Sequence, residues 1–334
     1  MSVLVPASKT AMATQGPVGY DDVPIDLHRK PVGADRMFNM VLAGASAIVL
    51  ILMVATVGFL IKYGWSALHQ AGLGLFTDPT WSPDSHHFGM MSLLVGSIAI
   101  ALLAVALATP ISIALALMIN EYAPRQLKPW LTGVVDMLAT VPSIVYGFWG
   151  LLLISNIQAA PARWLVAHAS FVPIFRTAAP NQYVKSIFAC GLICCVTIIP
   201  IITSVSREVM AQTPRDVCEA ALGLGGTRWG MVTDVILPFS RNGILGAVLL
   251  GVGRGLGETM IVVLVLSQGN HLTSALMGPG GLGSIAAEIT ENFVASSVIT
   301  KSALILLGLV LFMTTLGINI VARLIVERSN EGSL

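Results

Sequence analysis

The residues with the clearest capacity for chemistry are Arg254, Glu258 and Thr259, which lie in the run GVGRGLGETM. A guanidinium binds an oxyanion through paired hydrogen bonds, and a carboxylate accepts a hydrogen bond from a protonated oxygen. Arg254 and Glu258 are four residues apart, so a continuous helix places them on one face. A charge at mid-bilayer costs about 2.5–3.5 kcal/mol, so such residues pair or face a water-filled path. The pattern predicts either a path for an anion or an ion pair that only fixes helix packing.

Four glycines surround these residues, at Gly251, Gly253, Gly255 and Gly257. Glycine allows two helix backbones to approach closely and allows a helix to unwind locally. We therefore expect the element that carries Arg254 to pack tightly on its neighbours and to be able to adjust.

That element is one of six apolar runs in a chain with the composition of a membrane protein. Of its 334 residues, 55% are hydrophobic and 10% are charged, against about 25% charged residues in soluble domains. Each run is close to the roughly 20 residues that a helix needs to span hydrocarbon, and strands of a barrel would be shorter. We expect an all-α membrane protein with six transmembrane helices. The runs are 37–61, 90–119, 131–155, 186–205, 243–267 and 302–322.

Proline interrupts three of these runs, and the basic residues orient all six. Pro110, Pro142 and Pro200 predict kinks in the second, third and fourth runs. With the N-terminus in the cytoplasm, 12 of the 18 Lys and Arg residues fall on the cytoplasmic side and five outside, with Arg254 inside a span. Basic residues favour cytoplasmic loops, so we expect both termini to be cytoplasmic. Residues 1–36 are a polar tail predicted to be largely disordered, residues 37–325 the transmembrane domain, and residues 326–334 a second cytoplasmic tail.

A long polar interruption, residues 212–238, separates the fourth and fifth runs. Thr213 can cap a helix that Pro214 opens, and the glycines that begin at Gly223 end it. Thr227 can cap a second short helix that runs toward Leu237. We expect a cytoplasmic helix–turn–helix.

The spacing within this interruption resembles the EAA loop of ABC-importer permeases. Glu219, Ala220 and Ala221 are followed by Gly225 and by Leu237-Pro238 in the register of that family; Val235 stands where the family usually has isoleucine. The resemblance implies that residues 207–242 dock on a separate ATP-hydrolysing subunit. The chain has no phosphate-binding loop of the G-x-x-x-x-G-K-[ST] type, so we expect it to bind no cofactor and the partner to bind ATP and Mg²⁺.

Two runs narrow the resemblance to phosphate-importer permeases. GRGLGETM, with TVPSIVYGFWGL of the third apolar run, is similar to that family, and more to its PstC than its PstA subunits. The similarity covers about residues 88–322. It implies a type I ABC-importer fold, with an extra first helix and a five-helix core over 88–323, in the bacterial plasma (inner) membrane. It also implies a PstA-like second permease subunit, a PstB-like ATPase dimer and an external PstS-like phosphate-binding protein. The matching Arg and Glu are important in that family.

Two other functions stay open at this point. A permease for sulfate or molybdate differs in chemistry, because phosphate near neutral pH keeps a proton that Glu258 can accept a hydrogen bond from, whereas sulfate does not. A channel or secondary transporter without ATP is the second alternative, although it needs no docking loop.

The remaining features predict structure rather than chemistry. Net charge is +1, so no basic surface suggests nucleic acid. We interpret the His86-His87 pair as solvated loop residues and expect no metal site. Asp136 is expected near the cytoplasmic interface.

Residues around Trp164 suggest a short interfacial helix. Residues 268–298 are either a flexible outer loop or a segment with a function, as a gate or as a contact for a binding protein. The four cysteines are expected to be packed thiols: Cys190, Cys194, Cys195 and Cys218.

Overall fold

The computed structural model describes residues 33–82, 87–156, 159–177, 185–269, 271–294 and 296–331. Of the predicted tail over residues 1–36, residues 1–32 lie outside this description, as do the last three residues of the chain. Residues 33–36 are not disordered as predicted, because a helix already begins at Gly33. The chain divides into two compact units, Met1–Ala55 and Thr56–Leu334. In the first unit, residues 33–55 form the N-terminal part of helix α1 (Gly33–Ala71). That part is apolar, and each of its described side chains is exposed, as expected for a helix that needs surroundings of lipid or protein.

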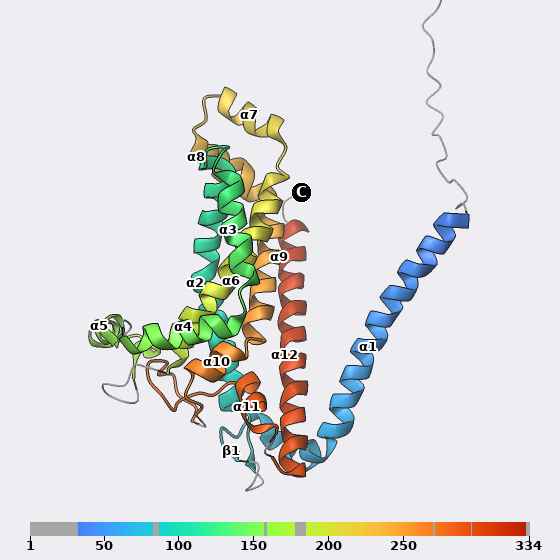
Figure 1. The fold of residues 1–334 in the computed structure, drawn as a ribbon, viewed down its shortest axis with the longest axis vertical. Coiled ribbons are helices and arrows are strands. Elements are labelled where there is room, and N and C mark those ends of the chain that lie inside the picture. Colours follow the sequence, from blue (N-terminus) through green and yellow to red (C-terminus); the bar gives the residue numbers. More distant parts are fainter. Residues whose placement is uncertain are drawn as a thin grey trace, which may run out of the picture. The chain divides into compact units, whose positions relative to one another are not determined.

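The second unit is a bundle whose long helices run side by side (Figure 1). They are α2 (Met91–Leu117), which continues as a π-helix (Met118–Tyr122), α6 (Ile187–Ala211), α9 (Leu237–Leu256) and α12 (Val298–Glu331). The buried core joins α2, α6 and α9 through small side chains such as Ala104, Cys194 and Ala247. Small residues let helix backbones approach closely where lipid gives no hydrophobic drive for association. Cys190, Cys194 and Cys195 are buried here, as predicted.

The predicted third span is two helices rather than one. Helix α3 (Lys128–Thr140) and helix α4 (Ser143–Asn156) meet at a bend of 91°. Proline lacks an amide hydrogen and moves the preceding residue out of the helical region, and Val141 before Pro142 is extended, with φ −64° and ψ 128°. Pro110 and Pro200 lie inside α2 and α6, which continue past them.

Several helices also extend beyond the apolar runs. α1 continues ten residues past Ile61, because its last turns pack against the start of α12. The Ser302 hydroxyl donates to the Tyr63 carbonyl at 2.6 Å and lies 3.0 Å from the Ser66 hydroxyl, and Ala67 is buried beside them. The apolar run ended at Ile61 and did not predict this extension, because an apolar run counts apolar residues and takes no account of hydrogen bonds between helices.

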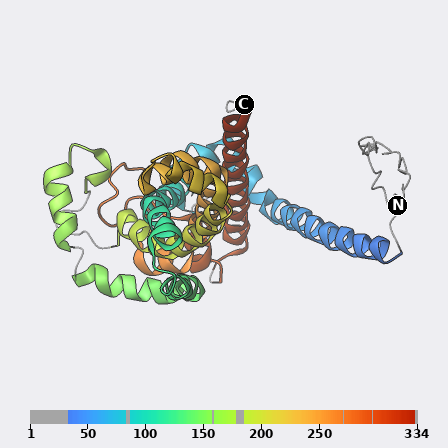
Figure 2. The same ribbon diagram turned by 90° about the horizontal axis from the view of Figure 1, so that it is seen from above.

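Short elements occupy the two ends of the bundle. At one end lie α7 (Arg215–Gly223) and α8 (Arg228–Met231); at the other lie α11 (Ile285–Asn292) and a small hairpin (Figure 1). The hairpin pairs β1 (Trp81–Ser82) with β2 (His87–Phe88) in antiparallel register. The remaining short elements are η1 (Gly72–Phe76), α5 (Ala159–Ala169), η4 (Pro173–Phe175) and α10 (Met260–Val265). Helix α5 is the short helix expected around Trp164, and with α4 it runs outward from the bundle (Figure 2).

The expected fold class is confirmed. Within the described residues, five helices are long and apolar enough to cross a membrane, and α3 with α4 makes a sixth span if the bent pair is counted as one.

Candidate functional site

The helix that carries Arg254 ends before it reaches Glu258. α9 stops at Leu256, Gly257 and Glu258 are not helical, and α10 begins at Met260. The prediction that Arg254 and Glu258 share one helical face is therefore wrong. Its premise was a continuous helix over residues 243–267, but the alternating glycines end that helix.

The two charged residues have different surroundings. Arg254 is exposed on the last turn of α9, whereas Glu258 is only 7% exposed. The Glu258 Oε1 accepts from the Ile261 amide at 3.5 Å, and the Thr259 hydroxyl donates to the Gly257 carbonyl at 3.2 Å. In the part of the chain that the structure describes, no ion pair joins Arg254 and Glu258. The guanidinium is thus open to a ligand, while the carboxylate holds the start of α10.

A second broken span packs directly on this break. α4 contacts α10, and a Cβ added at Gly147 would lie 2.7 Å from the Leu264 Cδ1 atom. Non-helical backbone at membrane depth is tolerated only where protein buries it or where it lines a water-filled cavity. The predicted third and fifth spans are therefore each discontinuous, and they meet beside Glu258.

A polar contact between α3 and α6 escaped the sequence analysis. The Arg207 Nη1 donates to the Thr132 hydroxyl at 2.8 Å, and the Ser204 hydroxyl donates to the exposed Asp136 carboxylate at 3.4 Å. Thr132 and Asp136 are four residues apart on α3, and Ser204 and Arg207 are three apart on α6, so each pair shares a helix face. These spacings of three and four residues between polar side chains were the only feature in the sequence that pointed to the contact between α3 and α6. The sequence had ended the fourth span at Val205, which separated Arg207 from it.

Between α6 and α9, the polar interruption begins with a helix that ends in a glycine cap. The Gly225 amide bonds the Leu222 carbonyl and the Gly226 amide bonds the Ala221 carbonyl, both within 3.1 Å. This is the Schellman pattern, in which the residue after the cap takes a left-handed conformation. Gly225 has φ +88°, so the position favours glycine for a conformational reason.

The start of that helix differs from the prediction. α7 begins at Arg215, with Pro214 at the N-cap position and no side-chain cap. The Thr213 hydroxyl does not cap it; this oxygen is buried and has no hydrogen-bond partner among the described residues. Proline occupies the position from which a threonine side chain would reach the first amides.

The second half of the interruption is continuous with the next span. The Thr227 hydroxyl accepts from the Gly230 amide at 3.0 Å, which is the predicted cap. α8 then passes through a π-helix (Val232–Ile236) into α9, so it is the first turn of the fifth span and not a separate short helix. Leu237 and Pro238 lie at the start of α9, where the missing proline amide is tolerated because the π-helix already changes the bonding pattern.

The exposed surface of this segment is unusually apolar for a polar loop. Leu224 is 91% exposed and Trp229 62% exposed. Glu219 and Ala220 are exposed beside them, and Ala221 is half-buried. An exposed apolar patch rimmed by polar residues is typical of a protein contact surface.

At the opposite end of the bundle, a buried carboxylate ties the hairpin to α11. The Trp81 indole donates to Glu288 Oε1 at 2.8 Å, and the Asn292 amide donates to the same oxygen at 2.7 Å. Burial raises the pKa of Glu288; the two hydrogen bonds oppose the rise, and the Glu291 carboxylate adds to it. Nothing in the sequence marked Glu288, because its partner Trp81 lies 207 residues away.

The segment that follows α10 is held by several hydrogen bonds. The Gln268 Oε1 accepts from the Ser284 amide at 2.9 Å, and the Met277 amide donates to the Arg176 carbonyl at 3.2 Å. Met277 and Leu282 are buried. The described residues of this segment are therefore packed against the rest of the bundle, which does not fit a flexible loop; the gate and the binding-protein contact both stay predictions.

The described residues contain no cluster of three or more His, Cys, Asp or Glu side chains that could hold a metal ion. Of the predicted His86-His87 pair, His86 lies outside the described residues and His87 is exposed in β2.

Known proteins are similar to this chain over most of its length. Residues 108–330 match the family model described as "Binding-protein-dependent transport system inner membrane component". The phosphate transport system permease protein PstC of Xylella fastidiosa strain Temecula1 is 34% identical over 88% of this chain and 91% of its own length. The PstC protein of Haemophilus influenzae is 33% identical over 89% of this chain and 94% of its own.

Two solved structures also resemble the chain. An inward-facing MetNI methionine ABC transporter chain is 15% identical, covers 70% of this chain and 96% of its own, and has a TM-score of 0.46. A chain from an amino acid ABC transporter with histidines is 18% identical, covers 72% and 93%, and has a TM-score of 0.47. From the family model and the curated relatives, the chain belongs to the binding-protein-dependent transport system inner membrane component family, among its phosphate transport permeases of the PstC type.

Proposed function

We propose that this chain is a membrane subunit of an ATP-driven importer that moves inorganic phosphate into the cytoplasm. The observation that carries the proposal is the exposed Arg254 guanidinium at the break between α9 and α10, in a chain whose relatives are phosphate permeases along most of their length. An arginine in a place poor in water neutralises and hydrogen-bonds an oxyanion. Phosphate is thus the ion that both the chemistry and the relatives support.

The two broken spans support a path that opens by alternating access. Discontinuous helices near the middle of the membrane are the usual site of substrate binding in transporters. α4 packs on α10, so a movement of one half-span shifts the other. Arg254 would bind the anion from α9, while Glu258 and Thr259 would set the geometry of the break.

The segment 207–242 would couple this movement to ATP hydrolysis by another chain. Leu224 and Trp229 offer an apolar contact surface next to Glu219, at one end of the bundle. The hydrolysing subunit would be a PstB-like dimer that binds ATP and Mg²⁺, whereas this chain would bind no cofactor. Both termini and this segment would lie in the cytoplasm, as the distribution of basic residues indicates.

Two further partners follow from the proposal. A dimeric ATPase needs two coupling segments and this chain has one, so a related PstA-like permease would supply the second. A PstS-like binding protein would deliver phosphate at the end of the bundle with the hairpin and α11. Crosslinking of the intact complex tests the pairing: an active complex with two copies of this chain and no other integral subunit contradicts it.

Transport by the purified complex tests the function itself. The complex is reconstituted in vesicles with ATP inside and its binding protein outside, and uptake of labelled phosphate and labelled sulfate is compared. We expect uptake of phosphate that requires internal ATP. Equal uptake of sulfate would support the permease for another oxyanion, and uptake without ATP would support a channel or secondary transporter.

A further inference from the structure

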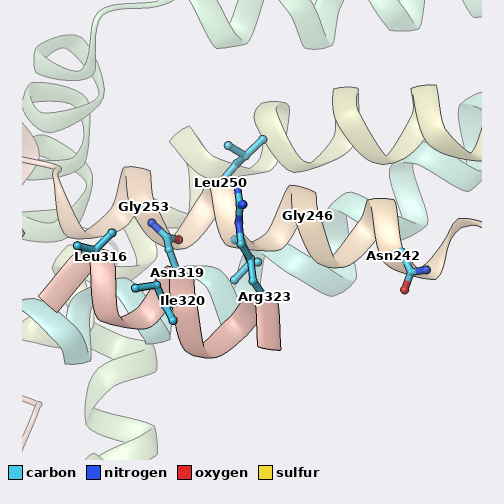
Figure 3. A pocket seen from close by; sticks show the side chains of 9 residues that line it. Asn242, Gly246, Leu250, Gly253, Leu316, Asn319, Ile320 and Arg323 are labelled. Carbon is cyan, nitrogen blue, oxygen red and sulfur yellow. The ribbon is translucent and has the colours of Figure 1, made fainter. Parts of the chain in front are cut away.

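A groove between α9 and α12 combines basic and apolar features that the transport function does not require. Its volume is about 920 Å³. Figure 3 shows Asn319 and Arg323 of α12 reaching toward the part of α9 that carries Leu250 and Gly253. The volume lies within the range of pockets that hold ligands of tens of atoms, and is much larger than a single inorganic anion needs.

The basic end of the groove lies where the apolar part of α12 ends. The apolar run over residues 302–322 stops directly before Arg323. Asn242 lies on the first turns of α9, which follow α8 and therefore belong to the end of the bundle with α7. Arg323 is exposed, and neither it nor Asn319 makes a side-chain hydrogen bond or ion pair within the described part of the chain. None of the described lining residues is acidic, so the charge of the groove suits an anion.

The apolar part of the groove continues from there into the span. Leu250, Leu316 and Ile320 line it and are between 40% and 57% exposed. Gly246 widens it, because a Cβ added there would meet nothing within 4 Å. All four residues lie inside helices that are long and apolar enough to cross a membrane, so this part of the groove suits an acyl chain. A basic pocket between transmembrane helices is a common site for an anionic lipid headgroup.

We propose that this groove binds an anionic phospholipid. The lipid phosphate lies against Arg323 and Asn319, and an acyl chain lies along Leu250, Leu316 and Ile320. Arg254 is not among the described residues that line the groove, although its neighbour Gly253 is; the lipid site therefore does not use the arginine proposed to bind phosphate. It gives the protein a preference for anionic lipid on the side of the membrane that holds α7 and α8.

Native mass spectrometry of the purified full-length chain, with the subunits it retains, tests the site. Phosphatidylglycerol or phosphatidylcholine is titrated in detergent, and bound lipid is counted. We expect preferential binding of phosphatidylglycerol, weakened about fivefold by Arg323→Gln, since one basic residue near a membrane surface contributes about 1 kcal/mol. Arg323→Lys should retain most of the preference. Gly246→Leu should reduce the binding of both lipids, because its side chain fills the groove.

Matched variants make the result specific. Arg125→Gln removes an exposed arginine outside the groove, and Gly317→Leu adds a side chain at an open position of α12 that does not line it; neither should change lipid binding. The proposal is overturned if the two lipids bind equally, or if Arg125→Gln has the effect of Arg323→Gln. It is also overturned if millimolar inorganic phosphate displaces the lipid, which would make the groove an ion site. A photocrosslinker at Leu250 that captures another subunit instead of lipid would make it a protein interface.

Discussion

Arg254 and Glu258 lie on opposite sides of a helix break, with the arginine exposed at the end of α9 and the glutamate buried against the first amides of α10. A continuous helix would have placed the two charges side by side, whereas the break leaves the arginine and the glutamate with separate roles. A salt bridge would have neutralised the guanidinium and reduced its attraction for an anion. In the observed geometry the guanidinium is available and the carboxylate stabilises the break.

Charge substitution at these two positions should therefore give unequal results. We expect Arg254→Gln to lower ATP-dependent phosphate uptake roughly tenfold to a hundredfold, the equivalent of one charge-assisted hydrogen bond. The exchange Arg254→Glu with Glu258→Arg should assemble yet stay inactive, because the guanidinium then lies beyond the break. Uptake of labelled phosphate into vesicles measures both, with membrane insertion of each variant as the control. Robust uptake by the exchanged protein would show that the pair acts only in packing.

The coupling segment should depend on Gly225 for a reason of backbone conformation. Its φ of +88° costs a residue with a side chain about 1–2 kcal/mol. Gly225→Leu should therefore disturb the Schellman cap of α7 and move Leu224 away from its position on the contact surface. We expect loss of co-purified ATPase and of uptake, with normal insertion.

Gly223→Leu is a matched control for that variant. A Cβ at Gly223 meets nothing within 4 Å, and its φ is not positive. The added leucine should leave more ATPase bound than Gly225→Leu does. Equal retention of ATPase by both variants, with full uptake, would contradict the role of the cap.

Much of the fold was predictable because its signals are local. Apolar length predicted six spans, Thr227 predicted its own helix cap, and the glycines after Leu222 predicted the end of α7. Each of these depends on residues within a few positions of one another, so tertiary contacts do not override them.

What escaped prediction depends on contacts between distant residues. Pro142 breaks its span but Pro110 and Pro200 do not, and the residues near each proline do not reveal which outcome the packing allows. The buried Glu288 became recognisable only when Trp81 was placed beside it. The break at Gly257 was suggested by glycines, yet the same glycines fit a continuous, tightly packed helix equally well.

Helix packing around the break should be sensitive to Gly255. A Cβ at this position would lie 3.2 Å from the Ala101 Cα atom of α2, and a backbone atom cannot move aside easily. Gly255→Leu should overpack the α2–α9 contact and destabilise the protein by about 1–3 kcal/mol. Thermal unfolding in detergent measures the change, and Gly317→Leu, at an open position, should leave the melting temperature nearly unchanged. A Gly255→Leu protein as stable as this control would show that α9 does not pack on α2 as closely as described.

The end of the bundle that holds the hairpin and α11 should lose stability as pH rises, through Glu288. Burial raises the pKa of this carboxyl above its ordinary value of 4.5, so between pH 4.5 and the raised pKa the folded protein holds a proton that the unfolded chain releases. The stability contributed by the protonated form is complete below pH 4.5 and is lost as pH rises through the folded pKa.

Glu288→Gln keeps an oxygen that can accept from Trp81 and Asn292 but cannot ionise. Its melting temperature should therefore depend less on pH and should equal or exceed that of the parent at neutral pH. Trp81→Phe removes one donor from the buried oxygen and should cost about 1–3 kcal/mol at neutral pH. Melting curves between pH 4 and pH 8 for the three proteins decide the matter: a Glu288→Gln curve parallel to the parent curve would place the pH dependence elsewhere.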